Sequence, residues 1–183
     1  AWKKDNALKV LTIGNSFSDD TMEYVYFIAK DLGIENVFLG NLYIGGCTLA
    51  THAANAKKNM PMYEYRTNDS GVWNTERVYP IKRALLSQNW DFVSLQQASG
   101  SSGMQDTYGD LAYLINYVKT YAPSAEIVWN MTWAYEQTSS HGEFVKYENS
   151  QEKMYNCIVS AVKNCVLTQS SVKKVIPCGT AIQ

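Results

Sequence analysis

The chain has 183 residues, of which 46% are hydrophobic and 18% are charged, and its formal net charge at pH 7 is −1. This length suits one folded domain with a substantial apolar core. The near-neutral charge gives no electrostatic basis for binding nucleic acid or an anionic membrane, and no apolar run approaches the roughly 20 residues of a membrane span. The sequence therefore predicts a single domain over residues 1–183, with no nucleic-acid partner and no membrane span.

The four cysteines form no close pair of the kind that binds zinc or carries out redox exchange; they are Cys47, Cys157, Cys165 and Cys178. We expect free thiols and no metal site, while a Cys47–Cys178 disulfide stays open. The chain begins at Ala1 rather than Met, followed by a polar stretch. Such a start is typical of a processed chain from which a secretion signal would already be missing.

The most informative stretch is 8–18. A short apolar run up to Ile13 predicts a strand, a turn follows at 14–16, and helical periodicity from about Asp19 predicts a helix that closes at Gly33. In open α/β sheets, ligands bind at such turns, at the carboxyl ends of the strands. A hydroxyl there lies near helix N–H groups that favour developing negative charge.

Ser16 is therefore the candidate nucleophile of this turn. Serine and aspartate are also favoured helix caps, so the alternative is that Ser16, Ser18 or Asp19 simply starts the helix.

The stretch Gly-Asn-Ser-Phe-Ser at 14–18, placed after an N-terminal strand, resembles the first sequence block of the SGNH (GDSL-like) hydrolases. In that family the serine of a Gly-Asp-Ser motif is the nucleophile, and Asn15 stands where the motif usually has Asp. The resemblance implies a serine esterase that forms an acyl-enzyme at Ser16 and needs no metal or organic cofactor.

The strand–turn–helix pattern then repeats. Residues 37–44 predict a strand, Gly45 and Gly46 a turn, and 49–59 a helix that Thr48 caps. The second SGNH block centres on a glycine at this turn, whose backbone N–H helps to bind the oxyanion, and the resemblance implies this role for Gly46. The alternative is a tight turn that needs positive φ.

Residues 60–79 predict a β-hairpin inserted on the α/β frame, with a turn rich in Asn, Asp and Gly. Most of its aromatic side chains are expected to pack within the hairpin, and Trp73 is kept as a candidate substrate contact.

Residues 91–97 predict the third core strand. The third SGNH block falls at its end, where an Asn side chain completes the oxyanion hole, and this sequence has no such Asn. Gln96 and Gln97 are the nearest amide donors, and the alternation of a strand aims only one of them at the cleft. We assign Gln97 to the oxyanion hole, with an ordinary polar strand end as the alternative.

The remaining periodicity predicts helices at 80–88, 108–121 and 147–166 and strands at 125–133 and 172–177. This alternation predicts a three-layer α/β/α fold. We expect a flavodoxin-like, doubly wound parallel sheet of about five strands in the order 2-1-3-4-5, with the hairpin as an insertion.

A serine nucleophile needs a base, which usually needs an orienting acid. SGNH hydrolases supply both from an Asp-x-x-His block after the last strand, and this sequence has none. We therefore expect the domain to be truncated at its C-terminus. The alternative is a whole chain in which His141, after the fourth core strand, serves as base or substrate contact, or in which catalysis is lost. His52, in the second predicted helix, is expected to be a surface or packed residue rather than a base.

The combination of Gly-Asn-Ser-Phe-Ser, Gly-Gly and a Leu-Gln-Gln strand end is similar to a bacterial branch of the superfamily that resembles carbohydrate O-acetyl esterases. The implied partner is a small-molecule or glycan ester, and the implied location is secreted or periplasmic. Two rival functions stay open. One is a flavodoxin-like protein that holds a phosphate or cofactor at 14–18. The other is a non-catalytic glycan-binding module of the same fold.

Overall fold

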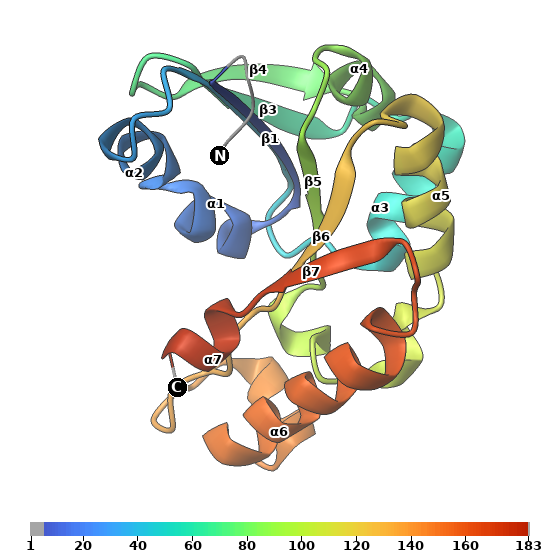
Figure 1. Ribbon diagram of the computed structural model, residues 1–183. Helices are drawn as coiled ribbons and strands as arrows, with labels where there is room; N and C mark the ends of the chain where they lie inside the picture. Colours follow the sequence, from blue (N-terminus) through green and yellow to red (C-terminus); the bar gives the residue numbers. More distant parts are fainter. Residues whose placement is uncertain (1–5, 183) are drawn as a thin grey trace.

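The computed structural model describes residues 6–182 and places one seven-stranded mixed sheet between helical layers (Figure 1). The strand order is β4-β3-β2-β1-β5-β6-β7. The strands are β1 (Ala7–Gly14), β2 (Asn36–Tyr43), β3 (Tyr63–Asn68), β4 (Asn74–Tyr79), β5 (Phe92–Leu95), β6 (Glu126–Asn130) and β7 (Val172–Ile176). The polar start before Asn6 lies outside the described residues.

Helices α1 (Ser16–Met22) and α2 (Val25–Asp31) contact β1 and β2 on one side of the sheet. The other side carries α3 (Leu49–Lys58), α4 (Ile81–Leu86) and α5 (Leu111–Tyr121), which contact one another (Figure 1). The last helices are α6 (Gln151–Ala161), its π-helical extension η4 (Val162–Val166), and α7 (Cys178–Ile182). Three 3-10 turns complete the chain: η1 (Ser99–Ser101), η2 (Gln105–Tyr108) and η3 (Gly142–Tyr147). None of the described helices is both long and apolar enough to cross a bilayer.

The alternation of β1 explains why helices cover both of its faces. Leu11 and Ile13 are buried in the larger cluster that α3, α4 and α5 share, whereas Leu8 and Val10 pack against the smaller cluster under α1 and α2. Successive side chains of a strand point to opposite faces, and a strand covered on both faces is apolar on both. Both clusters therefore hold β1 in the middle of the sheet, and the first exposed residue after its carboxyl end is Ser16.

The predicted three-layer α/β fold with a mostly parallel sheet is confirmed, but the predicted strand count and overall order are wrong. The hairpin is not a separate insertion, because β3 pairs antiparallel with β2 and extends the same sheet to seven strands. Tyr63 and Tyr65 of β3 are buried in the larger cluster. The sequence pattern of a hairpin shows that its two strands pair with each other, but it does not show that an outer partner is available.

The predicted helix from Asp19 to Gly33 is two short helices. Asn15 caps α1, and its Oδ1 accepts the N–H of Phe17 at 3.1 Å, so the helix begins at Ser16. The helical conformation is interrupted between α1 and α2 at Tyr24, whose ψ is −1°. Ser16, Ser18 and Asp19 were the alternative caps, and none of them caps α1. The hydroxyl of Ser16 therefore has no capping role.

Gly40 lies in β2 where three side chains converge, and this position predicts a packing effect. A Cβ on Gly40 would lie 3.0 Å from Leu11 and Trp90 and 3.1 Å from Tyr65. We expect Gly40→Ala to lower the free energy of unfolding by about 1–3 kcal/mol, measured by urea denaturation. The control is Gly109→Ala, because a Cβ there meets nothing within 4 Å. Equal stability of the two variants would contradict the packing account.

Candidate active site

The carboxyl end of β1 is tied to the neighbouring strand ends through the side chain of Asn15. Its Oδ1 accepts from the N–H of Phe17 and from Gln96 Nε2, the latter at 2.6 Å, while its Nδ2 donates to the carbonyl of Cys47 at 3.2 Å. The amide orientation follows from these partners, because a backbone N–H can only donate and a carbonyl can only accept. Asn15 therefore joins the turn after β1 to the turns after β2 and β5.

Gln96 continues this chain of amides toward β6. Its Oε1 accepts from Asn130 Nδ2 at 2.9 Å, and the same Asn130 nitrogen lies 3.0 Å from the hydroxyl of Thr21 on α1. Asn15, Gln96 and Asn130 are each at most 2% exposed, so these hydrogen bonds are shielded from water. Within residues 6–182, Asn130 Oδ1 has no hydrogen-bond partner. We call these three residues the amide chain.

Ser16 follows Asn15 of the amide chain as the first residue of α1 and is exposed. No described residue hydrogen-bonds to its hydroxyl or to its backbone N–H. Gly46 has φ +64°, and its N–H is likewise unpaired in the described part of the chain. The Asn15–Cys47 hydrogen bond joins the residue before Ser16 to the residue after Gly46. Two unpaired N–H groups thus belong to the two turns that this hydrogen bond joins, one of which carries the exposed hydroxyl, and such N–H groups can stabilise an oxyanion.

Gln97 points away from this arrangement. Its Nε2 donates to the carbonyl oxygen of Thr107 at 3.1 Å and to Thr107 Oγ1 at 3.0 Å, and its Oε1 accepts the N–H of Leu49 at 3.0 Å. Gln97 therefore anchors the start of α3 to the segment after β5. Its role in the oxyanion hole stays a prediction. Gln96 has the neighbouring position beside Asn15, and the sequence could not choose between the two because β5 ends at Leu95, before either residue.

His141 lies in the segment after β6 and is exposed. Its Nδ1 accepts a hydrogen bond from the N–H of Glu143 at 3.2 Å. The centroid of its ring lies 4.5 Å from that of Tyr135, whose hydroxyl forms a hydrogen bond with the hydroxyl of Ser99. A neutral ring that accepts at Nδ1 carries its proton on Nε2. No hydrogen bond joins it to Ser16 in the described structure, so its role as base or substrate contact stays a prediction.

His52 is fully buried in α3, which decides between the surface and packed positions that the sequence left open. Its Nδ1 lies 2.8 Å from Tyr63 Oη and 3.5 Å from Cys47 Sγ. Burial lowers the pKa of His52 to about 4 and raises the pKa of the Cys47 thiol to about 12. Both groups are therefore neutral at pH 7, and they do not form an activated thiolate–imidazolium pair. All four cysteines are free.

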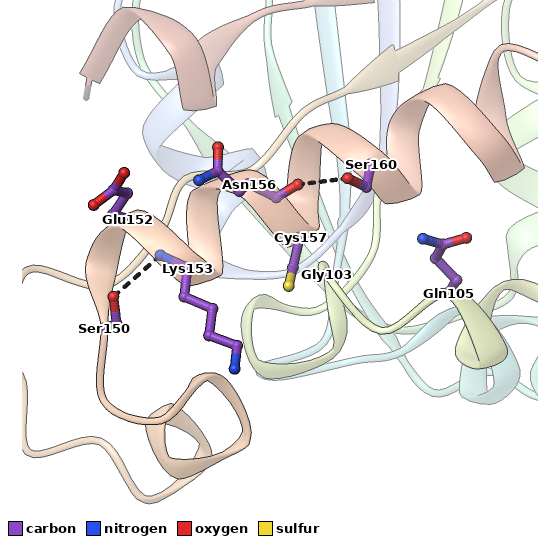
Figure 2. Close-up of a pocket in the computed structure, with 8 residues that line it drawn as sticks. All are labelled: Gly103, Gln105, Ser150, Glu152, Lys153, Asn156, Cys157 and Ser160. Atoms are coloured by element: carbon purple, nitrogen blue, oxygen red, sulfur yellow. Dashed lines mark hydrogen bonds between the residues drawn. The ribbon is translucent and has the colours of Figure 1, made fainter.

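A separate hollow of about 430 Å³ lies along α6 (Figure 2). Figure 2 shows the side chain of Cys157 directed toward Gly103 in the loop between η1 and η2. Neither Ser16 nor any residue of the amide chain lines this hollow. The free N–H groups and the exposed hydroxyl therefore lie at a different place on the surface.

Comparison with known proteins decides the family. Residues 9–183 match DUF4886, described as a domain of unknown function. The chain belongs to this DUF4886 family. A crystal structure of a DUF4886 family protein from Bacteroides uniformis ATCC 8492 has a TM-score of 0.92 and 40% sequence identity, over 97% of this chain and 69% of that chain. No curated protein matches the sequence significantly.

Solved structures of lower sequence identity share the fold of this DUF4886 chain. A candidate SGNH hydrolase from Slackia heliotrinireducens has a TM-score of 0.52 and 20% identity, over 87% of this chain and 76% of that chain. A Clostridium thermocellum family 3 carbohydrate esterase has a TM-score of 0.51 and 12% identity, over 93% and 77%. The expected SGNH fold is therefore confirmed.

The geometry explains why Asn rather than Asp precedes Ser16, and it predicts the effect of restoring the usual motif. In Asn15→Asp, a carboxylate would be buried against the carbonyl of Cys47, which it cannot serve as a donor. We expect a loss of about 1–3 kcal/mol in the free energy of unfolding at pH 7, measured by urea denaturation. Asn116→Asp, on the exposed face of α5, is the control and is expected to be near neutral. If Asn15→Asp is as stable as the control, the bridging role is wrong.

The burial of His52 predicts a pH dependence of stability. Its pKa is lowered to about 4 in the folded state, so the unfolded chain binds more protons between that value and the ordinary pKa of about 6.5. This contribution, up to about 3 kcal/mol, is present above pH 6.5 and is lost as the pH falls toward 4.

Urea denaturation at pH 7.5 and pH 4.5 measures this contribution. His52→Gln is expected to lose less stability between the two pH values than the unmodified protein, whereas the exposed control His141→Gln is expected to lose as much. Identical pH dependence in both variants would mean that His52 titrates normally.

Proposed function

We propose that the protein is a serine ester hydrolase in which Ser16 is the nucleophile. The single observation that carries the proposal is the exposed hydroxyl of Ser16 at the carboxyl end of β1, in a turn that Asn15 joins to the turn of Gly46, with the N–H groups of Ser16 and Gly46 unpaired in the described structure. The capping role that a serine at this turn could have is filled by Asn15 instead. The SGNH fold supports the assignment to hydrolases.

In the proposed reaction, Ser16 Oγ bonds to the ester carbonyl carbon as its proton passes to a base. The carbonyl oxygen becomes an oxyanion held by the N–H groups of Ser16 and Gly46, each donor worth about 3 kcal/mol in the transition state. The alcohol leaves with that proton, and water then attacks the acyl-enzyme and releases the acid. The amide chain holds the turn in place, and Gln97 remains a predicted third donor.

The base is the part of the mechanism that the described residues do not provide. Neither His52, which is buried with a lowered pKa, nor His141, which caps η3, is hydrogen-bonded to Ser16. Among the described residues, His141 is the proposed base or substrate contact.

The proposed substrate is a small, acetyl-type ester on a carbohydrate, and the proposed location is secreted or periplasmic. The likeness of the fold to a carbohydrate esterase supports the substrate class. A glycan-binding module without catalysis is the second candidate, and the lack of a base among the described residues favours it.

Turnover of p-nitrophenyl acetate by the natural protein, after its intact mass is measured, tests the proposal. We expect Ser16→Ala to lower kcat at least about 10³-fold, because the nucleophile is lost. The control is Ser140→Ala, another exposed serine, in the segment after β6, which is expected to leave turnover unchanged. Turnover that survives Ser16→Ala contradicts the esterase, and a natural protein that cleaves no ester favours the binding module.

A further inference from the structure

A hollow of about 500 Å³ lies between α1 and the β3–β4 hairpin, on the same helix that begins with Ser16. It is lined by Asp19 and Asp20 of α1, by Glu23 at the C-cap of that helix, and by Arg66, Trp73 and Thr75 of the hairpin. Its volume falls within the range of small-molecule sites. The two sides of the hollow thus come from segments that are far apart in the sequence.

The polar wall of this hollow is held rigidly. Asp19 accepts from Asn41 Nδ2 at 2.6 Å and forms an ion pair with Arg66, and Arg66 also pairs with Glu64. The guanidinium of Arg66 lies 3.8 Å above the ring of Tyr43. A donor and an acceptor are therefore oriented before any ligand arrives, which reduces the entropy lost on binding.

The aromatic wall is Trp73. It is half-buried and packs against the small cluster that contains Met22 and Leu39, while it also lines the hollow. In the described part of the structure, its indole N–H has no hydrogen-bond partner. An indole ring with a fixed orientation and a free donor offers an apolar face together with a polar edge.

The charge of the lining selects among ligands. Three carboxylates face one guanidinium, and Arg66 already pairs with Asp19 and Glu64. Neither Asp20 nor Glu23 forms an ion pair within residues 6–182. A carboxylated or sulfated ligand would be repelled, whereas a neutral ring with several hydroxyl groups can donate to the carboxylates and accept from Arg66.

The hollow extends from the helix that begins with Ser16 toward the amino-terminal half of the sheet. Trp73 lies in the hairpin turn after Asn68, which pairs with Leu39, four residues and about 13 Å before the end of β2. Asp19 and Asp20 follow Ser16 by three and four residues on α1, which corresponds to about 4.5–6 Å along the helix axis. Tyr43, beneath Arg66, is the last residue of β2 and pairs with Gly14 at the end of β1. The end of the hollow at Asp19 and Arg66 therefore lies toward the strand ends that carry Ser16, and Trp73 lies at the other end.

We propose that this hollow binds an uncharged pyranose unit of a glycan, with the apolar face of the sugar stacked on Trp73, a few units along the chain from the one that carries the ester. The inference rests on the proposed function for the reaction at Ser16, and it adds that the substrate is an oligosaccharide or polysaccharide with uncharged sugars. Trp73 is then a binding residue for the glycan chain and has no part in the chemistry of the ester bond.

Calorimetric titration of the natural protein carrying Ser16→Ala tests the binding. The probes are cello-, xylo- and manno-oligosaccharides as neutral ligands and oligogalacturonate as the anionic ligand. We expect at least one neutral series to bind more tightly than oligogalacturonate, and Trp73→Ala to weaken that binding at least tenfold. The control is Tyr113→Ala, in the aromatic hollow between α3 and α5, which is expected to leave binding unchanged.

A second variant protects the test against misfolding. Asp20→Asn with Glu23→Gln removes two exposed charges and leaves Trp73 in place, and it is expected to narrow the preference for neutral over anionic sugars. The inference is overturned if no neutral series binds, if oligogalacturonate binds best, or if Tyr113→Ala weakens binding as much as Trp73→Ala.

Kinetics separates this inference from the proposed function. With active protein, Trp73→Ala is expected to raise KM about tenfold for an acetylated neutral oligosaccharide and to leave p-nitrophenyl acetate turnover unchanged. If no ester is cleaved but neutral glycan binding still depends on Trp73, the esterase fails and the sugar site stands. If esters are cleaved and Trp73→Ala changes neither binding nor KM, the esterase stands and the sugar site fails.

Discussion

The candidate site depends on the side chain of Asn15, which makes three hydrogen bonds in a place shielded from water. One caps α1, one reaches Gln96 after β5, and one reaches the carbonyl of Cys47 after β2. Parallel strands end at the same edge of a sheet, but nothing in the strand ladders fixes the turns that follow them. Asn15 supplies that constraint, and it needs an amide because the three contacts require both an acceptor and a donor.

The same constraint accounts for the chemistry proposed for Ser16. Because Asn15 is the cap, the helix begins at Ser16 and its hydroxyl stays exposed and unbonded in the described structure. The hydrogen bond to Cys47 ties the turn of Gly46, whose N–H is unpaired in the described structure, to the turn of Ser16. Asp19 on α1 forms an ion pair with Arg66 on β3, and both residues line the hollow that also contains Trp73. A reactive centre and a sugar site would thus share one short helix, which suits an enzyme that acts on esters along a glycan.

Much of the frame could be predicted because its signals are local. The apolar runs that became β1, β2 and β5 to β7 and the cap at Thr48 needed only neighbouring residues. The sequence did not predict which strand pairs with the hairpin, because the pairing between β2 and β3 is a tertiary contact. The break at Tyr24 was hidden because the apolar spacing continues through it into α2. The choice between Gln96 and Gln97 could not be made because both follow the last residue of β5, where alternation no longer holds.

The central claim is that Ser16 is an activated nucleophile, and covalent labelling of the natural protein with a fluorophosphonate measures this most directly. An activated serine attacks phosphorus and releases fluoride, so the protein gains the mass of one phosphonyl group, and peptide mass spectrometry locates it. The account predicts one label, on the peptide that contains Ser16, and none in Ser16→Ala. Labelling at a different serine, or no labelling of the natural protein, would contradict the account.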